Sequence, residues 1–229
     1  MNLFLLLLAC AQINDLDTAA SDTDTDTDTD TDSDTDSDTD SDTDSDTDTD
    51  TDTDTDTDTD ADVPEPGDLL VVEFMFDPEA VDGDFGEWIE LLNVSNDTLD
   101  LEGVTIEDDN GDGFTIEGRL EVDAGERLLF CVDGDPEANG GVEPDYVYSI
   151  DLVKLGNDGD SVIVHLGDTL LDVVVYDDSF PIEEGRALQL DPSVDDPDDN
   201  DDADVWCKAD EEYGDGDRGT PGEPNTSCD

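Results

Sequence analysis

Two stretches of the chain decide its fold: LLVVEFM at residues 69–75 and EWIELLNV at residues 87–94. Both consist mainly of Leu, Val, Ile, Phe and Trp, and each has the length of a strand in a globular protein. The second run is apolar on both faces of an extended chain, as expected of a central strand. We therefore expect Trp88 to pack in a core.

Similar short runs recur along the chain, separated by Gly, Asp, Asn and Pro. They fall at residues 98–101, 104–107, 114–116, 127–132, 146–150, 161–166, 169–176 and 186–190. Strands at intervals of roughly 8 to 12 residues are typical of a sandwich or barrel. Asn110-Gly111 and Gly167-Asp168 fit hairpin turns, because these residues accept a positive φ. The sequence thus predicts an all-β domain.

The chain is strongly acidic. Its 229 residues include 72 Asp and Glu but only 6 Lys and Arg, giving a net charge of −66. Residues 67–229 hold 48 of the acids and all the bases, a net charge of about −42, with enough apolar residues to bury the core of one domain. Nucleic acid is excluded as a partner, because binding to phosphates needs Lys and Arg.

Residues 21–60 are twenty consecutive [Ser/Thr]-Asp dipeptides without an apolar side chain. Such a segment has nothing to bury, and its charges repel one another. We expect a disordered acidic stalk over residues 21–66, which would hold the domain away from its point of attachment.

The chain starts with MNLFLLLLAC, an apolar run too short to span a bilayer. Its end, Leu7-Leu8-Ala9-Cys10, resembles the lipobox of bacterial lipoproteins. The resemblance implies that residues 1–9 are a signal peptide and that Cys10 is lipidated, followed by a short mature segment at residues 10–20. It places the protein at the bacterial cell envelope, on the outer membrane or cell surface, with its lipid in the membrane. Because no Lys or Arg precedes the run, a plain secretory signal or a wrongly assigned start codon are the alternatives.

Four segments, in order, resemble the lamin-tail domain family: LVVEFMFDP at 70–78, GEWIELLN at 86–93, LEGVTI at 101–106 and GTPGEPN at 219–225. The resemblance covers about residues 67–228 and implies an immunoglobulin-like β-sandwich. Asn139-Gly140-Gly141, Trp206-Cys207 and Cys228 are similar to the form found in secreted proteins of myxobacteria and related groups. Nothing here resembles the coiled-coil rod of nuclear lamins, so filament assembly is not implied.

Cys131, Cys207 and Cys228 remain once Cys10 is assigned to lipid, an odd number. We favour a disulfide between Cys207 and Cys228, which bracket the Gly-Thr-Pro-Gly turn. Closing the loop between them would stabilise the fold by roughly 3 kcal/mol. Cys131 lies in an apolar run and is expected to be buried. Its pairing with either partner stays open at this stage.

The sequence offers little for catalysis. The single histidine, His165, alternates with valines, and neither Cys131 nor Ser161 stands in a nucleophile motif. Glu87 and Glu90 would suit an acid–base pair, but we expect them at an edge and in solvent. We therefore expect a non-enzymatic protein.

Calcium is the sharper chemical hypothesis. Asp108, Asn110 and Asp112, followed by Gly113, fit the start of a Ca²⁺-binding loop with alternating oxygen ligands. Arg119 stands where such a loop has its bidentate Glu, so a plain hairpin turn is the alternative. No other cofactor is expected.

Together these features favour a cell-surface lipoprotein that displays a lamin-tail-like sandwich for adhesion or for binding an envelope or extracellular protein. Two alternatives remain: an ionic coat protein with Ca²⁺-binding acidic loops, and an accessory module of a separate surface hydrolase.

Overall fold

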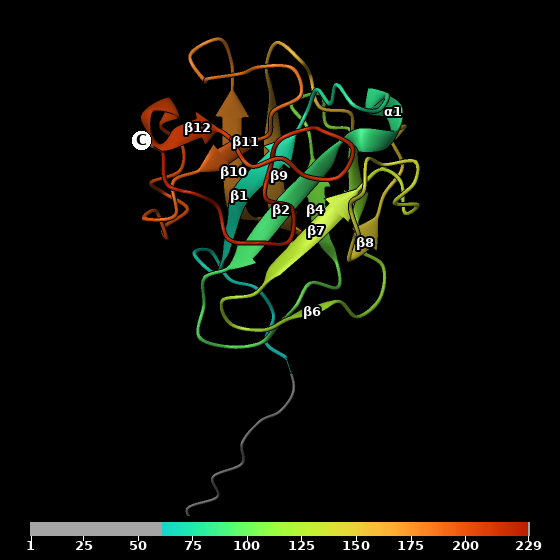
Figure 1. The fold of residues 1–229 in the computed structure, drawn as a ribbon. Helices are drawn as coiled ribbons and strands as arrows, with labels where there is room; N and C mark the ends of the chain where they lie inside the picture. The colour runs from blue at the N-terminus through green and yellow to red at the C-terminus, as the bar shows by residue number, and fades with distance from the viewer. Residues whose placement is uncertain (1–60, 229) are drawn as a thin grey trace, which may run out of the picture. The chain divides into compact units, whose positions relative to one another are not determined.

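The computed structural model describes residues 61–228, which are built almost entirely of strands and turns (Figure 1). Its only described helices are two single turns, α1 (Gly83–Gly86) and the 3-10 turn η1 (Ala203–Val205). Neither has the length or the apolar character that crossing a membrane requires. Cys10 and the [Ser/Thr]-Asp repeat lie outside the described residues.

The larger sheet has six strands in the order β12-β11-β1-β2-β7-β8. Its strands are β1 (Leu69–Met75), β2 (Trp88–Asn93), β7 (Arg127–Cys131), β8 (Tyr146–Val147), β11 (Leu188–Leu190) and β12 (Trp206–Lys208). All neighbours are antiparallel except β7 and β8. The two stretches that decide the fold, β1 and β2, lie next to each other at its centre.

The smaller sheet has four antiparallel strands in the order β10-β9-β4-β5. They are β4 (Val104–Glu107), β5 (Gly113–Thr115), β9 (Asp160–Leu166) and β10 (Thr169–Tyr176). Two further strands of two residues each, β3 (Leu99–Asp100) and β6 (Glu121–Val122), pair with each other as a separate antiparallel ribbon. Gly111 and Gly167 both have positive φ in the two predicted hairpin turns, of 80° and 58°.

The main core lies between the two sheets. It includes Phe74 of β1, Ile89 of β2, Ile106 of β4, Val164 of β9 and Val174 of β10, all essentially inaccessible to solvent. The fold is an immunoglobulin-like β-sandwich, as predicted.

A second, smaller core covers the outer face of the six-stranded sheet. Met75, Trp88, Leu129 and Cys131 alternate with the residues that face the main core, and they pack under Val142, Ala187, Ala209 and Tyr213. Trp88 is therefore buried as predicted, and its ring nitrogen donates to Tyr213 Oη at 3.0 Å. Both faces of this sheet are covered because the C-terminal part of the chain returns across it (Figure 1).

Described residues on the N-terminal side of residue 67 are also bonded to the sandwich. The amide of Asp62 donates to Thr98 O, and its carbonyl accepts from the amide of Asp100. Backbone groups alone make this pairing, so the acidic composition of the segment gave no sign of it.

Candidate functional site

The predicted calcium loop is the turn between β4 and β5, and Asp108 organises it. One carboxylate oxygen, Oδ1, accepts the amide protons of Asn110 at 2.8 Å and of Asp112 at 3.0 Å. The backbone closes the same turn, because the Asp108 amide donates to Asp112 O at 2.9 Å. Asp108 is buried for this reason, and one of its oxygens is already used by the fold.

The turn borders an open, acidic depression. Its other side is formed by residues 150–160, including Asp151, Lys154 and Asp160. The carboxylate of Asp160 accepts the amides of Gly156 and Ser161, and its charge is the main reason that the pKa of exposed Asp109 is raised. Within residues 61–228, no three Asp, Glu, His or Cys side chains converge as a metal-binding group would. Calcium binding at Asp108, Asn110 and Asp112 stays a prediction.

The expectation that Glu87 and Glu90 lie at an edge and in solvent is wrong, because both are fully buried. Glu87 Oε2 accepts the amide of Leu155 at 2.9 Å. Glu90 Oε2 accepts the amide of Gly222 at 2.6 Å, and Glu90 Oε1 lies 3.1 Å from Arg127 Nε. Each carboxylate therefore fastens a distant loop to β2 or to its start.

Glu73, in the middle of β1, has the same role. Its carboxylate accepts both the amide of Thr220, at 2.9 Å, and the Thr220 hydroxyl, at 2.7 Å. A lone carboxylate in an apolar strand has to find a partner when it is buried. That rule was the one signal in the sequence that could have pointed to Glu73.

Burial is the main cause of the raised pKa values of these groups. It raises the pKa of Glu73 to about 7 against the hydrogen bonds from Thr220, which lower it. It raises the pKa of Glu87 to about 8 and that of Glu90 to about 8, where the charge of Glu73 adds to the effect. These carboxyl groups therefore titrate near neutral pH.

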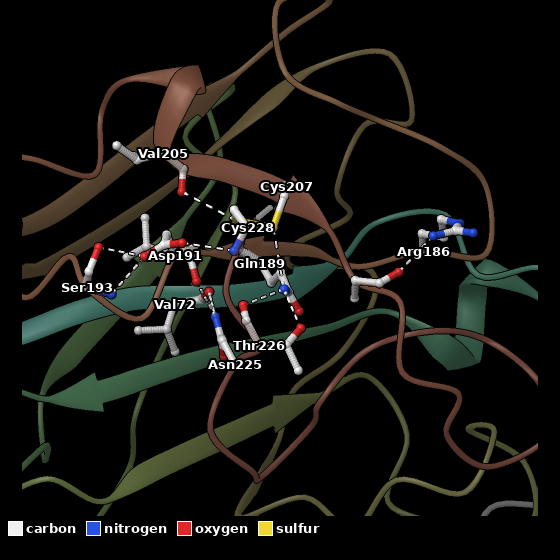
Figure 2. Close-up of a disulfide and its surroundings, with 12 residues drawn as sticks. Val72, Arg186, Gln189, Asp191, Ser193, Val205, Cys207, Asn225, Thr226 and Cys228 are labelled. Carbon is white, nitrogen blue, oxygen red and sulfur yellow. Dashed lines mark hydrogen bonds between the residues drawn. A yellow bond between two sulfur atoms is a disulfide. The ribbon is translucent and has the colours of Figure 1, made fainter.

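Residues 219–228, here called the C-terminal strap, lie over β1 and β2. Thr220 of the strap donates to Glu73, and Gly222 donates to Glu90. Figure 2 shows Asn225 donating to Val72 O at 2.7 Å and Gln189 donating to Thr226 O at 2.8 Å. Asn225 also donates to Leu190 O, so it joins β1 to β11. The strap ends in a disulfide between Cys207 and Cys228, which confirms the predicted pairing.

Comparison with known families identifies the part of the sandwich that precedes β11. A family model described as Lamin Tail Domain matches residues 62–178. The chain belongs to the lamin tail domain family. None of the curated proteins is similar enough to match it.

The match to the lamin tail domain ends two residues after β10. The chain goes on to add β11 and β12 to the same sheet as β1, followed by the strap. Two of the three carboxylates described above, Glu73 and Glu90, thus lie inside the matched region but bind amides outside it.

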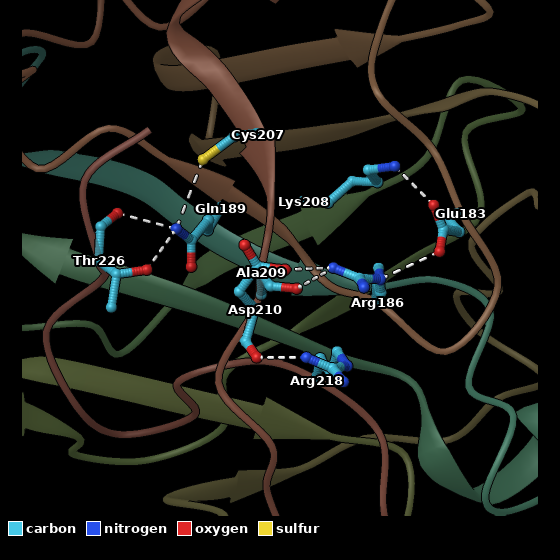
Figure 3. A network of polar contacts seen from close by, with 9 residues as sticks. All are labelled: Glu183, Arg186, Gln189, Cys207, Lys208, Ala209, Asp210, Arg218 and Thr226. Atoms are coloured by element: carbon cyan, nitrogen blue, oxygen red, sulfur yellow. Dashed lines mark hydrogen bonds and ion pairs between the residues drawn. The ribbon is translucent and has the colours of Figure 1, made fainter. Parts of the chain in front are cut away.

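A polar network joins neighbouring segments within this addition (Figure 3). Arg186 pairs with Glu183 and Asp210, Lys208 pairs with Glu183, and Arg218 donates to Asp210 O. Three of the six basic residues of the chain therefore hold neighbouring segments together.

His165 and Cys131 take structural positions. His165 is half-buried on the outer face of β9, with Nε2 3.3 Å from Glu107 Oε2 and Nδ1 3.0 Å from Gly167 O. Cys131 is buried in β7 as predicted and has no disulfide partner among residues 61–228, and burial raises the pKa of its thiol far above the usual range. A thiol with so high a pKa is a poor nucleophile.

Proposed function

We propose that this protein is a non-catalytic surface lipoprotein whose lamin tail domain binds another protein at the bacterial envelope. One observation carries the proposal: the carboxyl groups with the most strongly raised pKa values are taken up by the fold. Such groups often mark a catalytic site. Here Glu73, Glu87 and Glu90 each accept an amide proton from a distant loop, so their burial serves to rigidify a scaffold.

A rigid sandwich with exposed acidic loops suits recognition, since binding residues are commonly carried by loops on a fixed scaffold. Anchoring through Cys10 and spacing by the acidic stalk at residues 21–66 would present such a scaffold outside the cell. The family also supports a non-enzymatic role, because the lamin tail domain is an immunoglobulin-like fold.

The anchor is tested by metabolic labelling with a palmitate analogue. Wild type should be labelled and Cys10→Ser should not. Label on Cys10→Ser would overturn the anchoring. Cys131→Ser, which leaves Cys10 in place, controls for nonspecific loss of label.

The binding role is tested by chemical crosslinking on intact cells that express the full chain. A discrete crosslinked partner supports the proposal, and a partner that is a hydrolase supports the accessory role. If the chain stays with the envelope fraction but forms no discrete crosslinked product, the result favours the coat protein.

Calcium binding is the second candidate function. It is favoured by the crowding of acids at the depression, where the charge of Asp160 raises the pKa of Asp109. A divalent cation would relieve this repulsion. Calorimetry with Ca²⁺ tests it, with the variants given in the Discussion.

A further inference from the structure

Strand β10 leaves one edge of the four-stranded sheet open. It forms a ladder with β9 only among residues 61–228, although β1 lies close to it and is bonded through Val71 to the Asp172 carboxylate. Along an edge strand every second residue turns its N–H and C=O outward, which is a template for another strand. The N–H of Val173 is already donated to Asp172 Oδ1 at 2.7 Å, so an added strand would bond to the other outward groups of β10. Two side chains on this strand are also unusually exposed for their type, Leu170 at 51% and Val175 at 61%.

Two hollows follow this strand. The first, of about 400 Å³, lies beside residues 170–173, and the second, of about 580 Å³, lies beside Val175. Both are bounded on the other side by residues 196–204, part of the connection from β11 to β12, and Asp201 lines both. Together they form a groove between β10 and that connection, which we call the β10 groove.

One wall of the β10 groove is strongly acidic. Five exposed carboxylates line it, at Asp196, Asp198, Asp201, Asp202 and Asp204. Asp177 adds a sixth at the end of β10, and no Lys or Arg lines the groove. The acids also crowd one another, because partial burial and the charge of Asp198 raise the pKa of Asp201. A positively charged occupant would relieve this repulsion.

The two sides of β10 differ. Asp172 points between the sheets, where its carboxylate accepts the amide of Val71 at 2.6 Å and the side-chain amide of Asn200 at 3.0 Å. Asn200 belongs to the acidic connection, so this connection lies on the inner side of β10. Val173 pairs with Ile163 of β9 and, like Leu170 and Val175, is accessible from outside.

We propose that the β10 groove binds an extended segment of a partner protein in which Lys or Arg alternates with apolar residues, added to the sheet beside β10. Alternate side chains of an added strand point to opposite faces. The apolar ones would cover Leu170 and Val175 outside, and the basic ones would face the acidic wall. This inference rests on the proposed protein-binding role and names the chemistry of the partner.

Charge argues against a second copy of this chain as the occupant. The described acidic wall would meet another surface of the same sign, in a domain of about −42 net charge. A basic strand is not repelled in this way.

The test is the affinity of the full chain for a labelled (Lys-Val)4 peptide, measured by fluorescence anisotropy in about 150 mM salt, where long-range attraction is screened. Asp198→Asn with Asp201→Asn should weaken binding about tenfold, since two charge pairs are lost. Neither side chain accepts a hydrogen bond among the described residues, so the fold should be kept. The matched control, Asp48→Asn with Asp50→Asn, removes the same charge from the repeat and should change the affinity less than about twofold.

Two further measurements separate strand addition from attraction to a polyanion. A (Lys-Pro)4 peptide has the same charge, but half of its residues have no backbone N–H and its chain favours the polyproline II conformation, so it should bind at least about tenfold more weakly. Hydrogen exchange should show protection of residues 169–176 by (Lys-Val)4. Equal effects of the two Asp pairs, or equal affinity for the two peptides, would overturn the proposal.

Sedimentation of the full chain covers the remaining occupant. A dimer that Val175→Lys dissociates would assign the groove to a second copy and overturn the proposal. If the partner found by crosslinking on cells persists in the Asp198→Asn, Asp201→Asn variant, the binding role stands and only the β10 groove is excluded.

Discussion

Glu73 and Glu90 lie directly opposite each other on β1 and β2, both fully buried under the C-terminal strap. Like charges in this relationship destabilise a sheet. Here the cost is offset because Thr220 and Gly222 of the strap donate to the two carboxylates and Arg127 lies beside Glu90. Protonation of Glu73 and Glu90 is therefore linked to the hydrogen bonds that hold the strap on the sheet.

The first prediction concerns pH. The pKa values of Glu73, Glu87 and Glu90 are raised from 4.5 to about 7, 8 and 8. The folded chain thus keeps protons that the unfolded chain loses, and the free energy of unfolding should be highest below pH 4.5 with respect to these groups and fall as the pH rises to about 8. Urea unfolding at pH 5, 7 and 9 measures this.

Glu73→Gln should flatten that decline by on the order of 3 kcal/mol, the linkage value for its shift. The variant keeps an oxygen that can accept the Thr220 amide. The exposed Glu102→Gln is its control and should leave the pH dependence unchanged. A steep decline in Glu73→Gln equal to that of wild type would show that Glu73 does not titrate in this range.

The second prediction concerns the disulfide. Replacing Cys207 and Cys228 by Ala should lower the free energy of unfolding by roughly 3 kcal/mol, because the bridge closes a loop with a sequence separation of 21. Unfolding in urea, with and without reductant, measures the loss. Reductant should have no effect on the double variant, since Cys131 makes no bridge within the described part of the chain.

The third prediction separates the turn from the calcium hypothesis. Asp108→Ala removes the acceptor of two amides and should cost about 1 to 2 kcal/mol of stability without any metal. Asp108→Asn keeps an acceptor oxygen but loses the charge, so its stability should be close to that of wild type. If Ca²⁺ binds at this turn, calorimetry on the full chain will show a class of sites that Asp108→Asn lacks. Identical titrations of wild type and Asp108→Asn would rule the turn out.

The fourth prediction concerns the second core. Tyr213→Phe removes the oxygen that accepts from the indole of Trp88 and should cost about 1 kcal/mol, because that donor is buried. Thermal unfolding measures the loss, and a blue-shifted or quenched tryptophan emission would report the altered surroundings of Trp88. The exposed variant Glu102→Gln, which does not alter Tyr213, again serves as the control.

The strands with strong patterns could be read from the sequence. β1, β4 and β10 have the bounds that their apolar or alternating runs predict. β6 and β12 were missed because they are two and three residues long and exist only where a partner strand pairs with them. Period and composition carry no information about such pairing.

The candidate site was predictable only in part. The Cys207–Cys228 bridge followed from the turn that the two residues bracket. The burial of Glu90 depends on Gly222, 132 residues further along the chain, and that of Glu87 on Leu155, 68 residues further. From a local pattern, a charged residue is predicted to face solvent. In the fold, its carboxylate accepts a hydrogen bond from an amide that lies far away in the sequence.

The central position of β1 has a mechanical consequence. Tension reaching the domain from its N-terminal side enters through β1, which is bonded to β2 on one side and β11 on the other. The hydrogen bonds of both antiparallel ladders run across the strand, so a pull along it loads them together. A domain pulled at its N-terminal end would therefore resist extraction of β1, because the hydrogen bonds on both sides of the strand share the load.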